Sequence, residues 1–211
     1  MLIMDAVLET YGTKDFALWP VADPPAGPLL ALSGDLSPHE LGTAMAVLTS
    51  YNKGSRERRA ASPEDCVEQI RRLVATECIV APGGLRLRDT ATRVTVLPGC
   101  CNGLENWRDW LDLLDGGEPW LGHDPTPGVE HVAGAATVRL WPDGDDREGL
   151  PVSLPLAQLA VLLSSVREQL VGFLACVEEW TAQYAPRLTT AVVAKLSEDL
   201  AIGGPLQNNQ G

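Results

Sequence analysis

The clearest pattern in the sequence is a run of apolar residues, near its C-terminal end, that recur every three or four positions. The run lasts for nearly four heptads, and its members are Leu156, Leu159, Leu163, Val166, Leu170, Phe173, Val177 and Trp180. Residues with this spacing share one stripe of an α-helix. We therefore predict a helix over residues 155–183, which at 1.5 Å per residue is about 43 Å long.

A shorter helix is predicted over residues 187–201, after a break at Pro186. Its own apolar stripe consists of Leu188, Val192, Leu196 and Leu200. The two helices should form an antiparallel hairpin. Because the second helix is only about half as long as the first at 1.5 Å per residue, it leaves part of the long stripe uncovered. That part must pack on the body of the chain, or on a second copy in a homodimer. The residues of such a homodimer contact would be Leu156, Leu159, Leu163, Val166, Leu170, Phe173 and Val177.

Two capping boxes mark helix starts in the first half of the chain. Ser37 and Ser62 are each followed by a proline and, at the third position, by an acid. A serine at the N-cap accepts a hydrogen bond from the first turn, and the acid returns one to the serine backbone. We predict that a helix begins after each serine.

Short apolar or alternating segments predict strands. Residues 16–19 and 29–32 are apolar runs, while residues 85–88 and 93–96 alternate apolar and polar positions on either side of a turn. Strict alternation indicates a β-hairpin with one buried face. A further alternating strand is predicted over residues 137–141.

A third helix is predicted over residues 104–114. Four apolar residues would share one of its faces: Leu104, Trp107, Leu111 and Leu114. Asn102 is placed to cap its start, and the glycine pair at 116–117 ends it. Residues 120–128 are rich in Gly and Pro and predict a rigid loop or a bulged strand.

Together these elements indicate an α+β fold. The strands are short and do not alternate regularly with helices, which argues against a parallel sheet with crossover helices. We predict a small, mostly antiparallel sheet covered by helices, with a long C-terminal helical hairpin. The 211 residues divide into an α+β domain over 1–150, the hairpin over 151–203 packed on it, and a flexible tail over 204–211.

Negative charge is concentrated in one quarter of the chain. The net charge is −12, and residues 100–150, with eleven acids and three bases, contribute −8 of it. The same quarter holds four of the six tryptophans. This charge argues against non-specific nucleic-acid binding through phosphate neutralisation, whereas an acidic surface attracts a basic protein. Tryptophan is enriched at binding hot spots. We expect the partner-binding residues to be Asp109, Asp112, Trp120, His123 and Asp124.

The sequence shows no sign of export or of membrane insertion. Residues 1–5 lack a basic segment, and Asp5 and Glu9 interrupt the apolar positions, so this segment does not match a signal peptide. No stretch reaches about 18 uninterrupted apolar residues. The five cysteines are irregularly spaced, as expected for reduced thiols buried as small apolar side chains. We therefore expect a cytoplasmic protein that contacts no membrane.

No catalytic motif occurs in the sequence. It contains no phosphate-binding loop, zinc-protease helix or nucleophile elbow. The residue types of a tetrahedral zinc site do occur, at Cys100, Cys101, His123 and His131. However, the side chains of adjacent cysteines are expected to diverge. We therefore expect buried structural thiols, with zinc binding and redox sensing by the vicinal pair as alternatives. We predict no metal and no cofactor.

Two segments carry a resemblance to known proteins. PGCCNGLENWRDW over 98–110 and GGEPWLGHDP over 116–125 resemble a group of uncharacterised cytosolic proteins from GC-rich bacteria. More loosely, a helix that ends in Gly-Gly and leads into a tryptophan-bearing loop and strand is similar to toxin-immunity proteins of the SMI1/KNR4 type. The looser resemblance implies an immunity-type neutraliser. Neither resemblance supplies a catalytic residue.

These observations favour a non-catalytic intracellular binding protein that covers a basic partner through an acidic, tryptophan-rich surface, for example an immunity-type neutraliser. One alternative is a small enzyme, because titratable groups cluster beside rigid Pro and Gly residues. Its pocket would use His123, Asp124, Glu130 and His131. The other alternative is a self-association module built on the C-terminal stripe.

Overall fold

The computed structural model describes residues 1–10, 13, 16–22, 28–52, 62–147 and 149–206. In chain order, with η for a 3-10 helix, its elements are β1 (Leu2–Glu9), β2 (Leu29–Ala31), α1 (Pro38–Tyr51), α2 (Pro63–Ala75), β3 (Gly83–Asp89), β4 (Thr95–Val96), η1 (Leu104–Asp115), β5 (Gly128–His131), β6 (Thr137–Trp141), β7 (Val152–Pro155), α3 (Leu156–Tyr184), η2 (Pro186–Leu188) and α4 (Thr189–Asp199). Helix accounts for 44% and strand for 20% of the structure, which confirms the α+β class.

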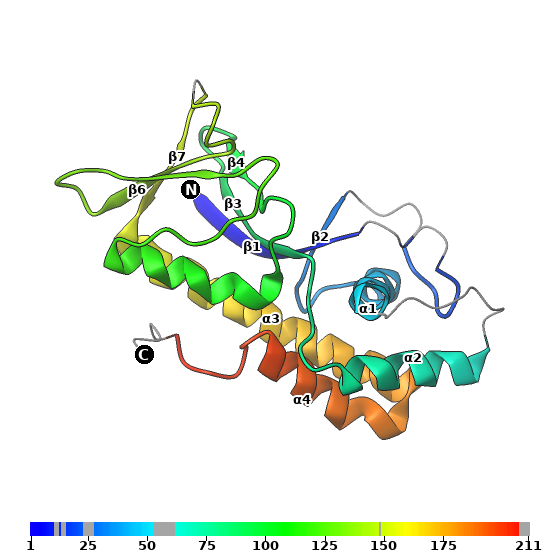
Figure 1. Cartoon of the computed structure of the whole chain (residues 1–211). Helices are drawn as coiled ribbons and strands as arrows, with labels where there is room; N and C mark the ends of the chain where they lie inside the picture. Colours follow the sequence, from blue (N-terminus) through cyan, green and yellow to red (C-terminus); the bar gives the residue numbers. More distant parts are fainter. Residues whose placement is uncertain (11–12, 14–15, 23–27, 53–61, 148, 207–211) are drawn as a thin grey trace.

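The strands form two antiparallel sheets. The first has the order β2-β1-β3-β4, and in it Leu87 lies between Met4 and Val96. The second has the order β5-β6-β7, with Val138 opposite Leu154. In Figure 1 the strands lie above the helices α2, α3 and α4. The sequence predicted one sheet. It did not predict the second, because β7 has only four residues and ends in a proline.

α3 is the central helix, and it packs against β1, α1, η1 and α4. Its bounds confirm the predicted long helix. The stripe residues Leu159, Leu163, Val166, Leu170, Phe173 and Val177 are each 0% exposed, and Leu156 is partly buried. The stripe therefore packs on the body of the chain, the first of the two predicted options. A homodimer through these residues would have to displace that packing.

α3 also completes the hydrogen bonding of β1 where β1 lacks a neighbouring strand. β2 pairs only with residues 7–9 of β1. Beyond β2, the Gln169 side chain donates to the Met4 carbonyl at 3.0 Å and accepts from the Ala6 N–H at 3.3 Å. A buried strand edge must have its polar groups satisfied. Gln169 performs this role and ties α3 to the first sheet.

By length and composition alone, α3 could cross a membrane. It meets this criterion through its average hydropathy, although it lacks a long uninterrupted apolar run. The central helix of a folded domain meets the same criterion. Here the apolar stripe lies against the sheet and the neighbouring helices.

The predicted helix over 104–114 forms as the 3-10 helix η1. Residues three apart share a face of a 3-10 helix. The buried residues follow this spacing, with one addition: Leu104, Trp107, Trp110, Leu113 and Leu111. Leu114, which was predicted on the buried face, is 40% exposed. The predicted cap is also wrong, because Gly103 is the N-cap and the buried Asn102 side chain accepts a bond from the Gly103 N–H.

Residues 16–19 form no strand. Their aromatic rings join a cluster between α1 and α3 instead. The ring of Trp19 lies 4.6 Å from that of Phe16 and 5.0 Å from that of Trp180. The Trp19 Nε1–H donates to the Gly42 carbonyl of α1 at 2.8 Å. This run is apolar because it packs in that cluster, which explains the wrong strand prediction.

The C-terminal segment is joined closely to the rest of the chain. Residues 151–203 begin with β7, which pairs with β6, and one hydrophobic core includes residues from both predicted domains. Arg108 of η1 donates to the carbonyls of Ala201, Gly204 and Pro205 at 2.8, 2.7 and 2.6 Å. These bonds hold the start of the predicted flexible tail, and residues 207–211 lie outside the described residues.

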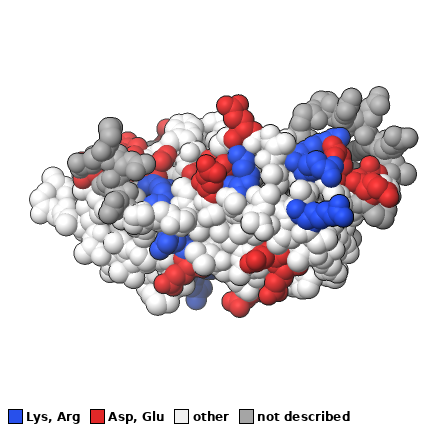
Figure 2. All heavy atoms as spheres, turned by 90° about the horizontal axis from the view of Figure 1, so that it is seen from below, with Lys and Arg blue, Asp and Glu red and all other residues white. Residues whose placement is uncertain are grey.

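The helical face of the molecule carries charges of both signs. Figure 2 shows this face from below, with acidic and basic side chains in small mixed groups separated by uncharged surface.

Candidate functional site

Two loops, residues 97–103 and 119–125, lie side by side and form what we call the loop junction. The Gly99 N–H donates to the Leu121 carbonyl at 2.7 Å. Cys100 and His123 exchange two backbone hydrogen bonds, of 2.6 and 3.0 Å, as in an antiparallel ladder. Residues paired in this way project their side chains on the same face. The junction thus brings together two chemically active residues from separate loops.

The loop junction depends on two glycines. A Cβ atom at Gly122 would lie 2.4 Å from the Gly99 carbonyl oxygen, and Gly122 has a φ of +92°. A Cβ atom at Gly99 would lie 2.5 Å from the Pro125 carbonyl oxygen. Only glycine adopts such a φ readily and allows so close a backbone approach. The two loops are therefore held at a distance that larger residues would not permit.

Three of the five predicted partner-binding residues lie at the loop junction. Trp120 is 53% exposed, and its ring centroid lies 6.4 Å from that of His123. The His123 Nδ1 lies 2.9 Å from a carboxylate oxygen of Asp124, whose side chain is 88% exposed. An aromatic ring, an imidazole and a carboxylate are thus presented side by side toward solvent.

The other tryptophans of the acidic quarter belong to the core. Trp107, Trp110 and Trp141 are 1%, 2% and 7% exposed. A tryptophan-rich surface was expected, but Trp120 is the one exposed tryptophan among the described residues of 100–150. The bulky aromatic side chains of this quarter mainly stabilise the fold.

Asp109 and Asp112 lie on η1 rather than in the two loops. Asp112 is exposed and Asp109 is partly buried. Burial raises the pKa of the Asp109 carboxyl, and the nearby charge of Asp112 raises this pKa further. η1 is followed directly by the second loop. Where η1 ends, the Gly117 N–H donates to the Asp112 carbonyl at 2.9 Å. A carboxylate kept where its charge is disfavoured is a feature of functional surfaces.

We predict that Asp109→Asn raises the free energy of unfolding at pH 7. A raised pKa means that the native state binds the Asp109 proton more tightly than the unfolded chain does, so the charged form destabilises the fold. The gain in the free energy of unfolding should be full above the native pKa of Asp109. It should vanish below the ordinary value of 3.8, where Asp109 is protonated in both the native and the unfolded state. Urea unfolding as a function of pH measures this difference. Asp112→Asn, at an exposed position, should have a smaller effect, and an equal effect would contradict the assignment.

The sequence predicted that the cysteines are mainly buried, and the structure contradicts this prediction. Cys66 is buried and Cys176 is intermediate, whereas Cys78, Cys100 and Cys101 are exposed. The last two are the pair in the loop junction. A small apolar role in the core therefore does not account for them.

The vicinal cysteines interact with each other. Their sulfur atoms are 3.6 Å apart. The hydrogen bond with Cys101 and the charge of Cys101 raise the pKa of the Cys100 thiol, and the charge of Glu9 raises it further. A reactive nucleophilic cysteine needs a lowered pKa. These surroundings therefore argue against nucleophilic catalysis by Cys100.

Sequence reasoning did not predict the meeting of Cys100, Cys101 and His123. One potential ligand atom from each side chain lies within 4.8 Å of the other two. His131, the fourth residue of the suggested zinc set, instead has its Nε2 at 2.9 Å from the Gly117 carbonyl. The paired glycines at 99 and 122 were the sequence signal that could have indicated a close approach of the two loops.

The residues of the enzyme alternative contact different partners. His123 contacts Asp124, His131 contacts the Gly117 backbone, and Glu130 lies 3.7 Å from Arg139 on the neighbouring strand. A general acid and base need to face one substrate. These contacts do not support a shared catalytic pocket.

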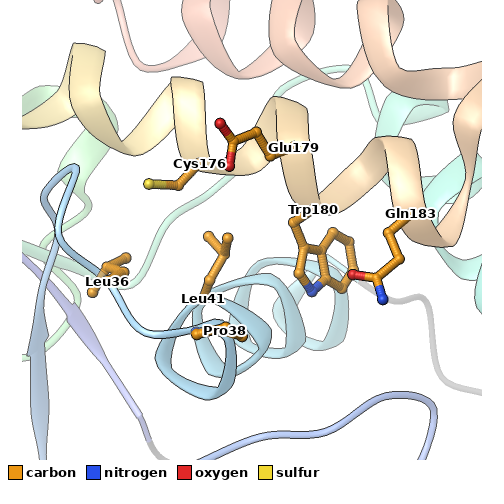
Figure 3. Close-up of a pocket in the computed structure, with 7 residues that line it drawn as sticks. All are labelled: Leu36, Pro38, Leu41, Cys176, Glu179, Trp180 and Gln183. Carbon is orange, nitrogen blue, oxygen red and sulfur yellow. The ribbon is translucent and has the colours of Figure 1, made fainter.

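Two of the cavities among the described residues lie away from the loop junction. One, of about 330 Å³, lies between the start of α1 and the C-terminal half of α3 (Figure 3). It is lined by Leu36, Pro38, Leu41, Cys176, Glu179, Trp180 and Gln183. The other, of about 550 Å³, is lined by Arg108 of η1, residues of α4 and residues 201–205. Neither cavity is lined by residues 123–131, so neither supports the enzyme alternative.

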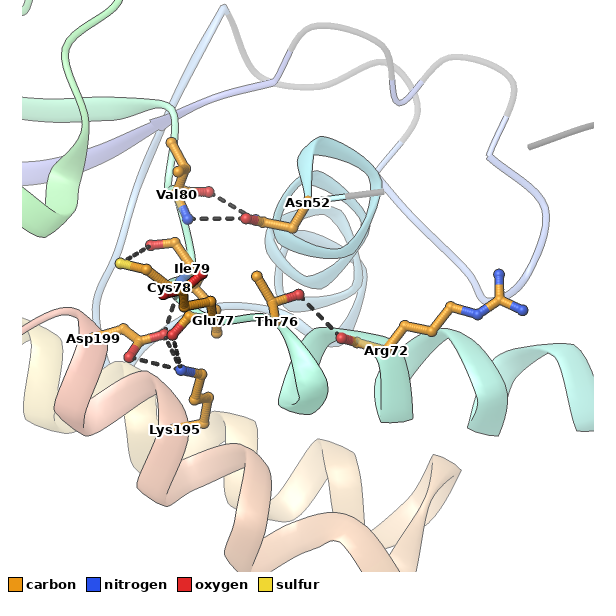
Figure 4. A network of polar contacts seen from close by, with 9 residues as sticks. All are labelled: Asn52, Arg72, Thr76, Glu77, Cys78, Ile79, Val80, Lys195 and Asp199. Carbon is orange, nitrogen blue, oxygen red and sulfur yellow. Dashed lines mark hydrogen bonds and ion pairs between the residues drawn. The ribbon is translucent and has the colours of Figure 1, made fainter. Parts of the chain in front are cut away.

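A second cluster of polar groups is structural. It ties the link between α2 and β3 to α1 and α4 (Figure 4). Asn52 exchanges two hydrogen bonds with the Val80 backbone, at 2.8 and 2.9 Å. Asp199 accepts a bond from the Ile79 N–H at 2.8 Å and pairs with Lys195 at 3.0 Å. All of these groups bind one another or the backbone, which is the pattern of a fold contact.

No protein-family model matches this sequence, and no curated protein and no solved structure matches it. The resemblances of segments 98–110 and 116–125 remain expectations. The candidate site therefore rests on its own geometry and charge.

Proposed function

We propose that this chain is a non-catalytic binding protein that covers a basic protein partner, with Trp120 as the central contact and acidic side chains around it. The observation that carries the proposal is that Trp120 is 53% exposed on a loop held by the contact between Gly99 and Gly122. Exposed tryptophans supply much of the affinity at protein interfaces. A rigid loop adds to that affinity because little conformational entropy is lost on binding.

The charge around Trp120 supports a basic partner. Residues 109–124 contain five acids and no lysine or arginine. Four of these acids are exposed: Asp112, Asp115, Glu118 and Asp124. Such a surface steers a basic protein toward it over a Debye length of about 10 Å at 0.1 M salt.

An immunity-type neutraliser is the specific role that we propose. Such a protein acts by covering a charged surface of its effector and needs no catalytic residue. The acidic segment, residues 109–124, and the looser of the two sequence resemblances support this role. We also propose a cytoplasmic location, because the five cysteines are free thiols, as is usual in a reducing compartment.

Trp120→Ala should weaken partner binding by at least about 2 kcal/mol, or roughly 30-fold in Kd. Partners are first captured from a lysate of the native host on immobilised wild-type chain and identified by mass spectrometry. The affinity of the purified partner is then measured by calorimetry. Tyr51→Ala is the matched control, because Tyr51 is a 58% exposed aromatic residue at the end of α1. It should leave the affinity unchanged.

The affinity should also fall as salt is added, since the surface charges are screened. A purified partner that binds Trp120→Ala as tightly as the wild type would contradict the proposal. A partner with a net negative charge would contradict it as well.

A further inference from the structure

The loop junction brings together three side chains of the types that bind soft metal ions. The ligand atoms of Cys100, Cys101 and His123 lie within 4.8 Å of one another, and the two sulfurs are 3.6 Å apart. In a tetrahedral zinc site with Zn–S bonds of about 2.3 Å, two sulfur ligands lie about 3.8 Å apart. The two thiols already have nearly the spacing that one zinc ion requires.

The backbone explains how adjacent cysteines converge. Neighbouring residues of an extended chain point to opposite faces, which was the reason to expect divergence. Cys101, however, has a φ of +60°, in the left-handed region. This conformation is uncommon for residues other than glycine, and such residues cluster at functional sites. The paired backbones of Cys100 and His123 then place the imidazole beside the thiols.

Asp124 contacts the His123 ring and orients it. Its carboxylate accepts a hydrogen bond from Nδ1, with 2.9 Å between the two atoms. With the proton on Nδ1, the neutral ring has its lone pair on Nε2. A carboxylate bonded to the other ring nitrogen is the usual outer contact of a metal-bound histidine, and it holds the ring in one orientation. Asp124 is therefore a positioning residue for His123.

The vicinal thiols do not readily form a disulfide with each other. Consecutive Cα atoms are about 3.8 Å apart, whereas the Cα atoms of a disulfide are usually at least about 4.4 Å apart. A bond between Cys100 and Cys101 would therefore be strained. The pair stays available as two thiols.

We propose that Cys100, Cys101 and His123 bind one zinc(II) ion, with water in the fourth position. Zinc(II) takes thiolate and imidazole ligands in tetrahedral geometry, and soft sulfur ligands select it over hard cations. On binding, two S–H bonds break, two Zn–S bonds form and two protons pass to the solvent. The neutral imidazole contributes its lone pair without losing a proton. Both cysteines are exposed, so water reaches the fourth position.

The zinc ion connects the two loops at a point beyond their backbone hydrogen bonds. It lies next to Trp120, whose ring is 6.4 Å from that of His123. Metal binding therefore stiffens the surface of the proposed partner contact. The zinc site does not depend on that contact, and its test uses no partner.

Cobalt(II) titration of the reduced full-length chain, without oxygen, tests the proposal. Tetrahedral cobalt(II) with thiolate ligands shows sulfur-to-metal charge-transfer bands and strong visible bands. We expect saturation at one ion per chain and loss of the bands when zinc(II) is added. Zinc affinity is measured by competition with a chromogenic chelator. Cys100→Ser and Cys101→Ser should each reduce the charge-transfer intensity and lower this affinity by more than the roughly 100-fold limit for an outer-contact residue.

Two further variants distinguish the proposed zinc ligands from residues that do not bind the ion. Asp124→Asn should lower zinc affinity by about 10- to 100-fold, while the charge-transfer bands remain at saturation. Cys78→Ser is the matched control, because Cys78 is an exposed cysteine outside the loop junction. It should change neither the spectrum nor the affinity. Circular dichroism confirms that each variant is folded.

Three outcomes would overturn the proposal. The first is a wild-type chain without charge-transfer bands. The second is a Cys78→Ser variant that loses as much affinity as Cys100→Ser. The third is binding of copper(I) without cobalt(II) or zinc(II), which would assign the same ligands to copper(I).

Discussion

Two aspartates introduced at Leu163 and Leu170 should unfold the chain. Both leucines are 0% exposed on the inner stripe of α3. Transfer of a carboxylate from water into such surroundings costs several kcal/mol even after the protein relaxes. Two such costs are comparable with the whole stability of a typical domain, about 5–15 kcal/mol. Circular dichroism of the double variant Leu163→Asp/Leu170→Asp should show loss of the helical signal at 25 °C.

The matched control uses the other face of the same helix. Val161 and Val171 are 70% and 51% exposed, so Val161→Asp/Val171→Asp should keep the native spectrum. Light scattering on the wild type and both double variants also tests self-association. If the wild type is a dimer and Leu163→Asp/Leu170→Asp is a folded monomer, the stripe belongs to a subunit interface and our assignment of it to the core is wrong.

Trp107→Ala should lower the free energy of unfolding by about 3–5 kcal/mol, as for other large aromatic residues removed from a core. Trp107 is 1% exposed, and its indole Nε1–H donates to the Leu200 carbonyl at 2.8 Å. The substitution leaves a cavity between η1 and the end of α4. It also leaves the Leu200 carbonyl without this donor. Denaturation in guanidinium chloride, followed by circular dichroism, measures the loss.

Trp120→Ala is the comparison for Trp107→Ala. The residue type and the change are the same, but Trp120 is 53% exposed. Its removal should change the free energy of unfolding by no more than about 0.5 kcal/mol, as for most surface positions. An equal loss at both positions would show that Trp120 supports the fold, and any effect on binding would then be indirect.

Local signals made most of the helices predictable. The capping boxes at Ser37 and Ser62 hold the first turns of α1 and α2 through bonds between residues three apart. The stripe of α3 runs from Leu156 to Trp180 within a 29-residue helix, so its period is evident. The β3–β4 hairpin was predicted for a similar reason, because Leu87 and Val96 pair within an alternating pattern.

The strand β1 shows why other elements were missed. It is the centre of the first sheet, yet its alternation is obscured because Ala6, Val7 and Leu8 are all 0% exposed. A strand covered on both faces has apolar residues in succession and no period of two. Its identity depends on the elements that cover it, and these are distant in sequence.

The candidate site was also predictable only in part, because some of its features depend on segments that are distant in sequence. Composition located the acidic segment and marked Trp120, His123 and Asp124 as candidates. Composition alone did not show which tryptophans are exposed, although the helical pattern placed Trp107 on the apolar face, and η1 buries Trp107 and Trp110 at a spacing of three. η1 packs against β1, β3 and α3, and residues 104–115 carry no local signal that predicts a 3-10 helix.

The sequence by itself therefore determined where α1, α2, α3 and α4 lie, since caps and periodic stripes act within one element. It also determined the position of the acidic segment. Only the tertiary structure decided that Cys100, Cys101 and His123 meet at one point. That meeting requires a left-handed Cys101 and a close approach of Gly99 to Gly122. Both are consequences of two loops packing together, and contacts between segments leave no periodic pattern along the chain.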